Sequence, residues 1–159
     1  MINIRHAKQE DVPQLVEFLK ALFAIETDFE FDRHKQSQGL KRLLENDQAC
    51  ILVAESGDNQ TLCGLCSIQI LLSTAEGGPV GLLEDLFVDM AFRNQGIGSK
   101  LLAEAIAWSE RQGLTRLQLL ADKLNLPALS FYEKQGWQST QLVCLKKSLA
   151  GKVPYSSEP

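Results

Sequence analysis

The sequence predicts an α/β fold, a central twisted and mixed β-sheet flanked by helices, in the order β-α-α-β-β-β-α-β-α-β. Three observations predict it. The apolar residues switch between alternation, typical of strands, and a spacing of three to four residues, typical of helices. Turn-forming stretches separate three consecutive strand-like segments, which favours antiparallel neighbours. A strand–helix–strand unit then spans residues 82–121, and such a unit sets its two strands parallel through a right-handed crossover.

The N-terminal third of the chain predicts one strand and two helices. Residues 2–5 alternate apolar and polar side chains as a short strand does. From about residue 9 to residue 25 the apolar residues follow helical spacing. An acidic segment poor in helix formers, 26–32, predicts a loop, and residues 33–46 predict a second helix with leucines on its apolar side.

The middle of the chain predicts a three-stranded antiparallel meander. Its strands are expected at residues 49–55, 61–72 and 82–88. The turn-forming run 57–60 separates the first pair, and the glycine-rich run 77–81 breaks the chain before the third strand.

The C-terminal part predicts helices and strands in alternation. Residues 97–112 and 126–135 have the pattern of helices, each followed by a glycine, where a helix commonly ends. A strand is expected between them at 117–121, and a last strand over Gln141–Leu145.

Length and composition indicate one globular domain. The chain has 159 residues with 16 basic and 20 acidic side chains, a net charge of −4, and we expect a single domain over residues 1–149 and a polar tail over 150–159. The acidic balance argues against a nucleic-acid partner. No apolar run long enough to span a membrane occurs, and the N-terminus has no secretory signal pattern. Four cysteines lie in apolar, strand-like stretches, which predicts free thiols and a cytoplasmic location.

The strongest local signal for chemistry is the run Arg93-Asn-Gln-Gly-Ile-Gly-Ser99, between a predicted strand and a predicted helix. Its glycines let a ligand approach the backbone, and successive amides at the start of a helix can hold an anion. The run is not a Walker A loop, because that motif needs a glycine five positions before its Gly-Lys pair. It is not a dinucleotide fingerprint either, because position 101 is leucine where that motif has glycine. A plain tight turn explains the same residues, and spacing alone leaves both interpretations open.

Two blocks together resemble the GNAT superfamily of N-acetyltransferases. Arg93, Gly96 and Gly98 match the superfamily's Gln/Arg-x-x-Gly-x-Gly/Ala signature. The run from Asn125 through Ala128, Phe131, Tyr132 and Gly136 to Trp137 looks like its second block, Asn-x-x-Ala-x-x-Phe-Tyr-x-x-x-Gly-Phe, with tryptophan as the last aromatic residue. The opening, Ile4-Arg-x-Ala7 before a helix, also fits. The resemblance covers nearly the whole chain and implies the GNAT fold, with acetyl transfer from acetyl-CoA to an amine.

The resemblance also implies where acetyl-CoA binds. Amides of residues 94–99 would hold the pyrophosphate, and the backbone of residues 86–88 would pair with the pantetheine arm and polarise the acetyl carbonyl. The residues expected to bind the cofactor are Leu86, Phe87, Val88, Arg93, Asn94, Gln95, Gly96, Ile97, Gly98, Ser99, Asn125, Ala128, Phe131 and Tyr132. Tyr132 matches the position that protonates the departing thiolate in many members, and the alternative for it is a core aromatic residue.

Glu84 and Asp85 interrupt an otherwise apolar strand. Neighbouring strand residues point to opposite faces, so the two carboxylates are not expected to act as one pair. Glu-Asp at this place resembles the diamine and polyamine acetyltransferases, whose glutamate faces the amine. Glu84 is therefore expected either to take a proton from the acceptor or to form a salt bridge, and a structural role is favoured for Asp85.

The acidic segment 26–32 suggests what the acceptor is. Glu26, Asp28, Glu30 and Asp32 could form, with Glu84, a negative approach that attracts a small cationic amine of the diamine or polyamine kind. A solvated loop explains the same residues, and an aminoglycoside, an amino acid or a peptide N-terminus remain as acceptors. The alternative to an enzyme is a regulatory module that binds acyl-CoA without turnover. No metal is expected, and a homodimer would be common for the superfamily.

Overall fold

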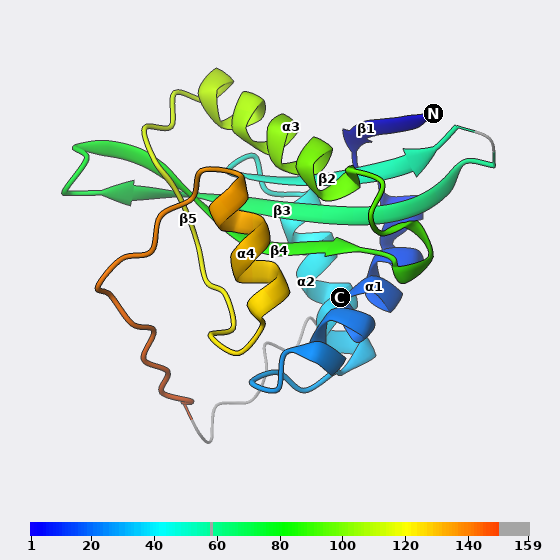
Figure 1. Cartoon of the computed structure of the whole chain (residues 1–159), viewed down its shortest axis with the longest axis horizontal. Helices are drawn as coiled ribbons and strands as arrows, with labels where there is room; N and C mark the ends of the chain where they lie inside the picture. Colours follow the sequence, from blue (N-terminus) through cyan, green and yellow to red (C-terminus); the bar gives the residue numbers. More distant parts are fainter. Residues whose placement is uncertain (58, 150–159) are drawn as a thin grey trace.

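Five strands form one sheet whose spatial order follows their order in the chain (Figure 1). The computed structural model describes residues 1–57 and 59–149. The strands are β1 (Ile2–His6), β2 (Ala49–Ser56), β3 (Thr61–Ser73), β4 (Gly78–Val88) and β5 (Leu117–Leu119). The helices are α1 (Val12–Ile25), α2 (Arg33–Leu44), α3 (Ile97–Arg111) and α4 (Leu126–Lys134), with short 3-10 turns η1 (Gln9–Asp11) and η2 (Met90–Phe92). Strands β1 to β4 pair antiparallel and β5 pairs parallel with β4, which confirms the predicted mixed sheet.

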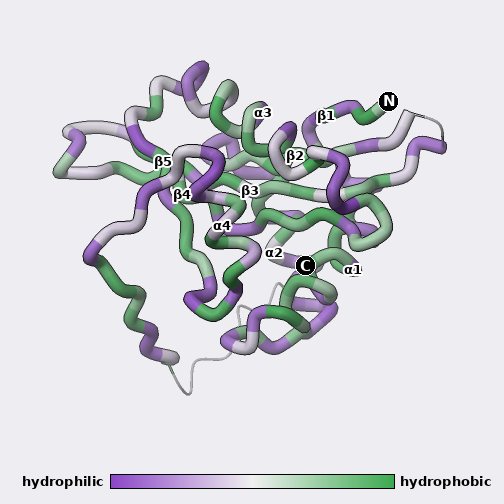
Figure 2. Tube along the Cα trace, viewed as in Figure 1, coloured by the Kyte–Doolittle hydropathy of each residue, from purple (hydrophilic) through white to green (hydrophobic). Residues whose placement is uncertain are grey.

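The helices cover both faces of the sheet and enclose two apolar clusters. Successive strand residues point to opposite faces, so β2 contributes to both. Ile51 and Val53 pack with Leu15 in the cluster under α1 and α2, whereas Leu52 packs with Leu101 in the cluster under α3. Hydrophobic segments accordingly run along the central strands in Figure 2, with hydrophilic segments at the turns. None of the helices in the described residues is both long and apolar enough to cross a membrane.

The predicted strand over Gln141–Leu145 is wrong. These residues pair with no other strand in the described part of the chain, and Leu142 and Leu145 are 86% and 90% exposed. A strand exists only where a neighbouring edge takes up its backbone hydrogen bonds, and an apolar pattern cannot show whether that edge is within reach. Cys144 is exposed as well, unlike the other three cysteines. The predicted polar tail, 150–159, lies outside the described residues.

Strand β4, which the sequence predicts over residues 82–88, begins four residues earlier. It starts at Gly78, because the β3–β4 hairpin turns at residues 74–77 and pairs from Ser73 and Gly78 onward. Only the last residue of the turn, Gly77, has a left-handed backbone, with φ of 69°.

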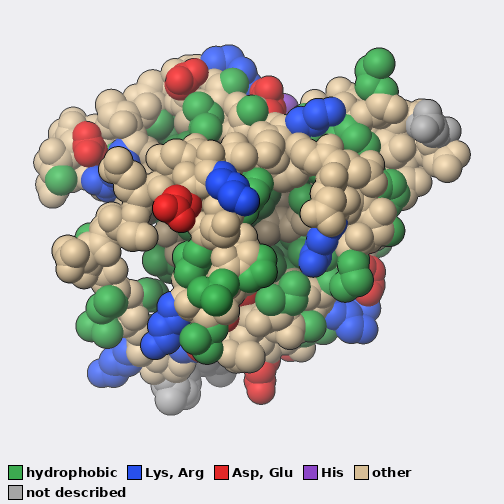
Figure 3. Space-filling model, in the orientation of Figure 1, with side chains coloured by type: hydrophobic (Ala, Val, Ile, Leu, Met, Phe, Trp, Pro, Cys, Tyr) green, Lys and Arg blue, Asp and Glu red, His purple; other side chains and the backbone are tan. Residues whose placement is uncertain are grey.

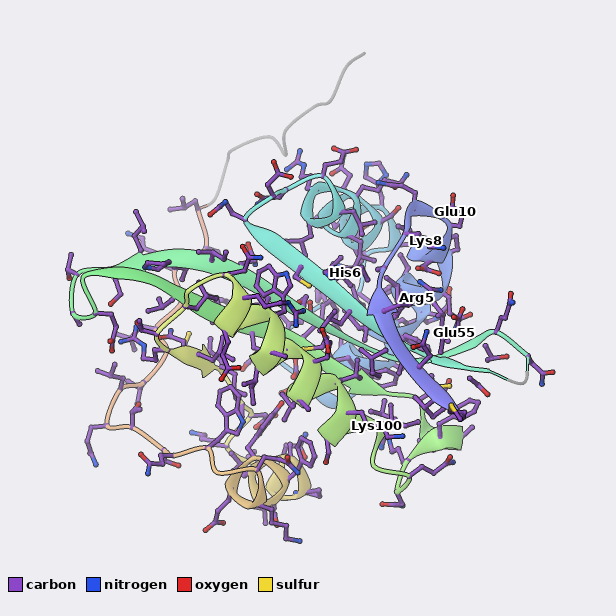
Figure 4. All side chains as sticks on the ribbon, turned by 90° about the horizontal axis from the view of Figure 1, so that it is seen from above. Arg5, His6, Lys8, Glu10, Glu55 and Lys100 are labelled. Atoms are coloured by element: carbon purple, nitrogen blue, oxygen red, sulfur yellow. The ribbon has the colours of Figure 1, made fainter. Side chains whose placement is uncertain are left out.

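Arg5 links β1 to η1 and β2 through its side chain. Its guanidinium donates to both carboxylate oxygens of Asp11 and to both of Glu55, at 2.8 to 3.1 Å. Figure 4 shows Arg5 and Glu55 side by side on the first two strands. These charge-assisted hydrogen bonds raise the pKa of Arg5 above its usual value, and they connect β1, η1 and β2.

Gly64 is needed where β3 pairs closely with the end of β4, opposite Val88. A Cβ atom here would lie 2.5 Å from the carbonyl oxygen of Phe87, a backbone atom. We expect Gly64→Ala to lower the free energy of unfolding by at least about 2 kcal/mol, as overpacking of a tight contact does. Urea denaturation measures the change. Gly39→Ala is the control, because a Cβ there in α2 meets nothing within 4 Å and alanine favours helix by up to about 1 kcal/mol. Equal stability of the Gly64→Ala variant and the wild type would contradict the packing described here.

Candidate active site

Strands β4 and β5 separate after a short pairing, and this separation organises the site. They pair only from Gly81 to Leu83 against Leu117 to Leu119, while β4 continues to Val88. Beyond Leu83 no strand within residues 1–57 and 59–149 lies beside the edge of β4 that faces away from β3. The predicted pantetheine residues, Leu86, Phe87 and Val88, lie on this free edge. Their backbone can therefore bind an extended ligand as another strand would.

The run 93–99 forms the start of α3. Gly96 is the N-cap with φ of 73°, and no side chain caps the helix. The first amides of a helix have no partner within the helix, so the N–H groups of Ile97, Gly98 and Ser99 remain available to an anion. A Cβ on Gly96 would meet nothing within 4 Å, so the space beside this N-cap residue is open. Asn94 and Gln95 are exposed in the loop before them.

Arg93, although exposed, turns back onto β4. Its Nε donates to the carbonyl oxygen of Val88 at 3.0 Å, and its guanidinium lies 5.7 Å from the centroid of the Phe87 ring. Its contacts therefore hold the glycine loop against the free edge of β4.

The second block builds α4 and docks it onto α3. Asn125 is the N-cap of α4, and its side chain accepts a hydrogen bond from the amide of Ala128 at 3.3 Å. A Cβ on Gly98 would lie 3.2 Å from the ring of Phe131, so glycine allows the two helices to approach closely. At the other end of α4, Gln135 donates to the hydroxyl of Ser99 at 2.9 Å.

Tyr132 lies partly buried between two aromatic rings. The centroids of Phe131 and Trp137 are 5.4 and 5.9 Å from that of Tyr132, both in edge-on arrangements. Burial raises the pKa of Tyr132 to about 12, and the negative charge of Glu26 acts in the same direction. The phenol therefore keeps its proton at neutral pH, which is the state that a proton donor needs.

A β-bulge places Glu84 and Asp85 on one face of the sheet, so the expectation of opposite faces is wrong. Both residues lie opposite Ser67, because Leu83 pairs with Ile68 and Leu86 with Cys66. Ser67 donates to Asp85 at 2.9 Å, and Glu84 accepts from Gln69 at 2.8 Å. Ser67 and Gln69 are two residues apart on β3 and so share a face. The extra residue of the bulge turns both carboxylates toward the face of the sheet that Ser67 and Gln69 share.

The charges of three carboxylates act on Glu26, and the charge of Glu26 acts in turn on Tyr132. Burial raises the pKa of Glu26, and the charges of Asp85, Asp122 and Asp28 raise it further. Burial also raises the pKa of Asp85 to about 6, although the hydrogen bond from Ser67 opposes the shift. These carboxylates come from the end of α1, the bulge of β4 and the loop that follows β5. A cationic group would relieve their repulsion.

The structure brings together only some of the predicted acceptor residues. Glu26 and Asp28 belong to this acidic group, whereas Glu30 is exposed on the loop between α1 and α2. Asp32 caps α2 by accepting from the amides of His34 and Lys35. Glu84 is exposed and bonded to Gln69. Sequence reasoning missed Asp122, which could have been found as the acidic residue just after the strand that runs parallel to β4.

No three His, Cys, Asp or Glu side chains in residues 1–57 and 59–149 are placed to hold a metal ion. The groups available to a ligand are instead amides, an unpaired strand edge, a phenol and carboxylates. The uncapped amides and the open space at Gly96 suit a pyrophosphate, and the free edge of β4 suits an amide-containing chain. Both are parts of acetyl-CoA, so the residues present fit that cofactor.

Comparison with known proteins gives a consistent result. The model of the acetyltransferase (GNAT) family matches residues 14–137. An uncharacterized N-acetyltransferase of Bacillus subtilis, YhfO, is 30% identical over 128 residues, covering 78% of this chain and 81% of its own. Among solved structures, a transcriptional regulator from Bacillus halodurans C-125 has a TM-score of 0.82 at 25% identity, with 94% of this chain and 100% of the other covered. The aminoglycoside N-acetyltransferase AAC(6')-Iy in complex with CoA has a TM-score of 0.80 over 93% of this chain and 95% of its own, and its 18% identity shows the fold alone.

Proposed function

The chain belongs to the acetyltransferase (GNAT) family, and we propose that it transfers the acetyl group of acetyl-CoA to a small cationic amine of the diamine or polyamine kind, by direct attack in a ternary complex. The observation that supports the choice of acceptor is the group of carboxylates around Glu26, whose pKa is raised first by burial and then by the charges of Asp85, Asp122 and Asp28. Such a group attracts and orients a cation and repels an anionic acceptor. The proposed location is the cytoplasm, as the free cysteines indicate.

Acetyl-CoA, when bound, supplies an acetyl thioester that an amine can attack. The amides of Ile97, Gly98 and Ser99 would hold its pyrophosphate, with Arg93 fixing the loop from behind. The free edge of β4 over residues 86–88 would hold the pantetheine arm. Tyr132 would supply the proton that the departing sulfur needs, because its phenol carries that proton at neutral pH.

An acceptor ammonium has to lose a proton before its nitrogen can attack, since it has no free electron pair. Two neighbouring carboxylates on β4 could take that proton. Glu84, the residue that the sequence favours, is exposed and hydrogen-bonded to Gln69. Asp85 is largely buried, is oriented by Ser67 and has a pKa of about 6, which makes it a stronger base than an ordinary aspartate. We therefore assign the base to Asp85 and give Glu84 a part in attracting the acceptor.

Removing the Asp85 carboxylate is expected to lower kcat more than removing the Glu84 carboxylate. We expect Asp85→Asn to lower kcat about 100-fold or more, the size typical of a lost general base. The matched Glu84→Gln variant should change kcat by less than about tenfold. Below pH 6 the Asp85 carboxylate is protonated and cannot accept a proton, so kcat/KM of the wild type should fall as the pH drops through about 6. Two results together would assign Asp85 a structural role. The two variants would lose kcat equally, and kcat/KM of Asp85→Asn would still fall as the pH drops through about 6.

The acceptor class is tested by the steady-state release of free thiol from acetyl-CoA with a panel of amines. The panel contains diamines, polyamines, amino acids, aminoglycosides and an amino sugar phosphate, each at low and high salt. We expect the highest kcat/KM with diamines or polyamines and a decrease at high salt, because screening weakens attraction between exposed charges. A preference for the phosphate-bearing acceptor, or no salt dependence with polyamines, would contradict the proposal.

A further inference from the structure

Two serines are the buried polar side chains of the described residues, and their hydroxyls have different partners. Ser109 donates to the carbonyl oxygen of Ala105, one turn earlier in its own helix, at 2.8 Å. Such a bond is local and common for serine in helices. Ser67 is 1% exposed, and its hydroxyl donates across two strands to the Asp85 carboxylate at 2.9 Å. Ser67 is therefore a buried hydroxyl committed to a group that can take a proton.

Ser67 holds Asp85 at two points. Besides donating to the carboxylate, its hydroxyl oxygen accepts a hydrogen bond from the backbone amide of Asp85 at 3.2 Å. Both bonds lie at the β-bulge, where Ser67 faces Glu84 and Asp85 at once. A bulge leaves backbone groups without their ladder partners, and here the serine oxygen takes one of them up. The side chain and the backbone of Asp85 are thus fixed by the same hydroxyl.

Within residues 1–57 and 59–149, the groups that act on Asp85 from its surroundings are acidic or neutral. Glu84 lies beside it on β4, and the charge of Glu84 raises the pKa of Asp85. Glu26, at the end of α1, and Asp85 repel each other. Cys66 on β3 stays a neutral thiol, because burial raises its pKa. β5 consists of leucine and glutamine, and α3 covers the other face of the sheet.

The charged form of Asp85 depends on a hydrogen bond from the protein. Burial raises the pKa of Asp85 to about 6, and the bond from Ser67 opposes this rise. Nearby, Leu86 of β4 and Phe131 of α4 pack in one apolar cluster, and Figure 3 shows hydrophobic side chains gathered over α4. A carboxylate in apolar surroundings that lacks a donor takes up a proton. A protonated Asp85 could not accept a proton from the acceptor amine.

We propose that Ser67 is a positioning residue of the reaction: its hydroxyl holds the Asp85 carboxylate charged and in one orientation, and so sets the lower limit of the pH range for turnover. Ser67 acts through Asp85, so this role rests on the proposed function. Buried as it is, Ser67 does not itself touch the acceptor. After Asp85 has taken the acceptor's proton, the bond from Ser67 favours the ionised form and hence the release of that proton to water.

The test compares Ser67→Ala with Ser109→Ala, since each variant loses one buried serine hydroxyl. A hydrogen bond to a charged group is among the stronger ones, so the fall of kcat/KM, expected near pH 6 in the wild type, should move up by at least about one pH unit in Ser67→Ala. Ser109→Ala should keep the wild-type pH profile. Ser67→Thr, which retains a hydroxyl, should keep it too. Circular dichroism confirms that the variants fold.

A second measurement reads the charge of Asp85 without any acceptor. Carbon-13 NMR follows the carboxyl signal of Asp85 during a pH titration, and the signal is identified by its loss in Asp85→Asn. The pKa of Asp85 should be higher in Ser67→Ala than in the wild type and unchanged in Ser109→Ala. In the Asp85→Asn background, Ser67→Ala should lower kcat no further, because two residues that act through one group are not additive.

The outcomes that overturn the proposal are distinct. An Asp85 pKa that Ser67→Ala leaves unchanged would show that the hydroxyl does not hold the charge. A higher Asp85 pKa with an unmoved pH profile would show that Asp85 is not the base, so the proposal would fall together with the proposed function. An equal movement of the profile in Ser67→Ala and in Ser109→Ala or Ser67→Thr would show an effect of packing and not of the hydroxyl.

Discussion

Replacing Gly96 by glutamate is expected to weaken coenzyme A binding at least about 100-fold. The new carboxylate would stand before the uncapped amides of α3, where open space now surrounds Gly96. Repulsion between unit charges about 4 Å apart near a protein surface is roughly 4 kcal/mol, more than this loss requires. The left-handed backbone of Gly96, with φ of 73°, also disfavours a side chain. Isothermal titration calorimetry with coenzyme A measures the loss.

Gly77→Glu is the matched control for this experiment. Gly77 also has a left-handed backbone, with φ of 69°, and a Cβ there also meets nothing within 4 Å. It lies in the β3–β4 turn and not in the glycine loop. The control therefore introduces the same charge and a similar strain away from the proposed pyrophosphate site, and it should bind coenzyme A as the wild type does. If folded Gly96→Glu binds with unchanged affinity, the loop is not the cofactor site.

Replacing Tyr132 by phenylalanine should lower kcat by about 100-fold to 10,000-fold when chemistry limits the rate, because a general acid contributes that much. The ring keeps its contacts with Phe131 and Trp137, so affinity for coenzyme A should change little. Stopped-flow measurement of a single turnover gives the rate of the chemical step.

A donor with a more acidic thiol distinguishes proton donation from packing. Such a sulfur leaves without protonation, so an acetyl thioester of low thiol pKa should recover much of the lost rate in Tyr132→Phe. A variant with the wild-type rate, or one equally slow with both thioesters, would assign Tyr132 to packing alone.

Local sequence was enough to predict where the helices beside the candidate site begin. The glycine loop depends on backbone conformation at Gly96 and on uncapped amides a few residues later, and both follow from neighbouring residues. Asn125 and Ala128 form a helix cap through the same short-range geometry. The sequence did not predict that Phe131 and Gly98 meet, because their contact depends on how α4 packs against α3.

The parts that could not be predicted depend on pairing between distant segments. Alternation along β4 predicts Glu84 and Asp85 on opposite faces of the sheet. Only the pairing register, in which both residues lie opposite Ser67, reveals the bulge that places them on one face. The acidic group around Glu26 likewise needs the end of α1 and the loop after β5 to be placed beside β4. Leu142 has the pattern of a strand residue, but the pattern cannot supply the edge with which a strand pairs.

The central claim, that carboxylates around Glu26 select a cationic acceptor, is tested most directly by comparing a diamine with the monoamine of equal chain length. The measured quantity is the ratio of their kcat/KM values in the wild type and in Glu26→Gln. The second positive charge of the diamine is the only major difference that the acidic group can recognise. We predict a ratio of at least about tenfold in favour of the diamine and a clear reduction in Glu26→Gln. A ratio near one in the wild type, or a diamine preference that Glu26→Gln leaves unchanged, would contradict this account of the site.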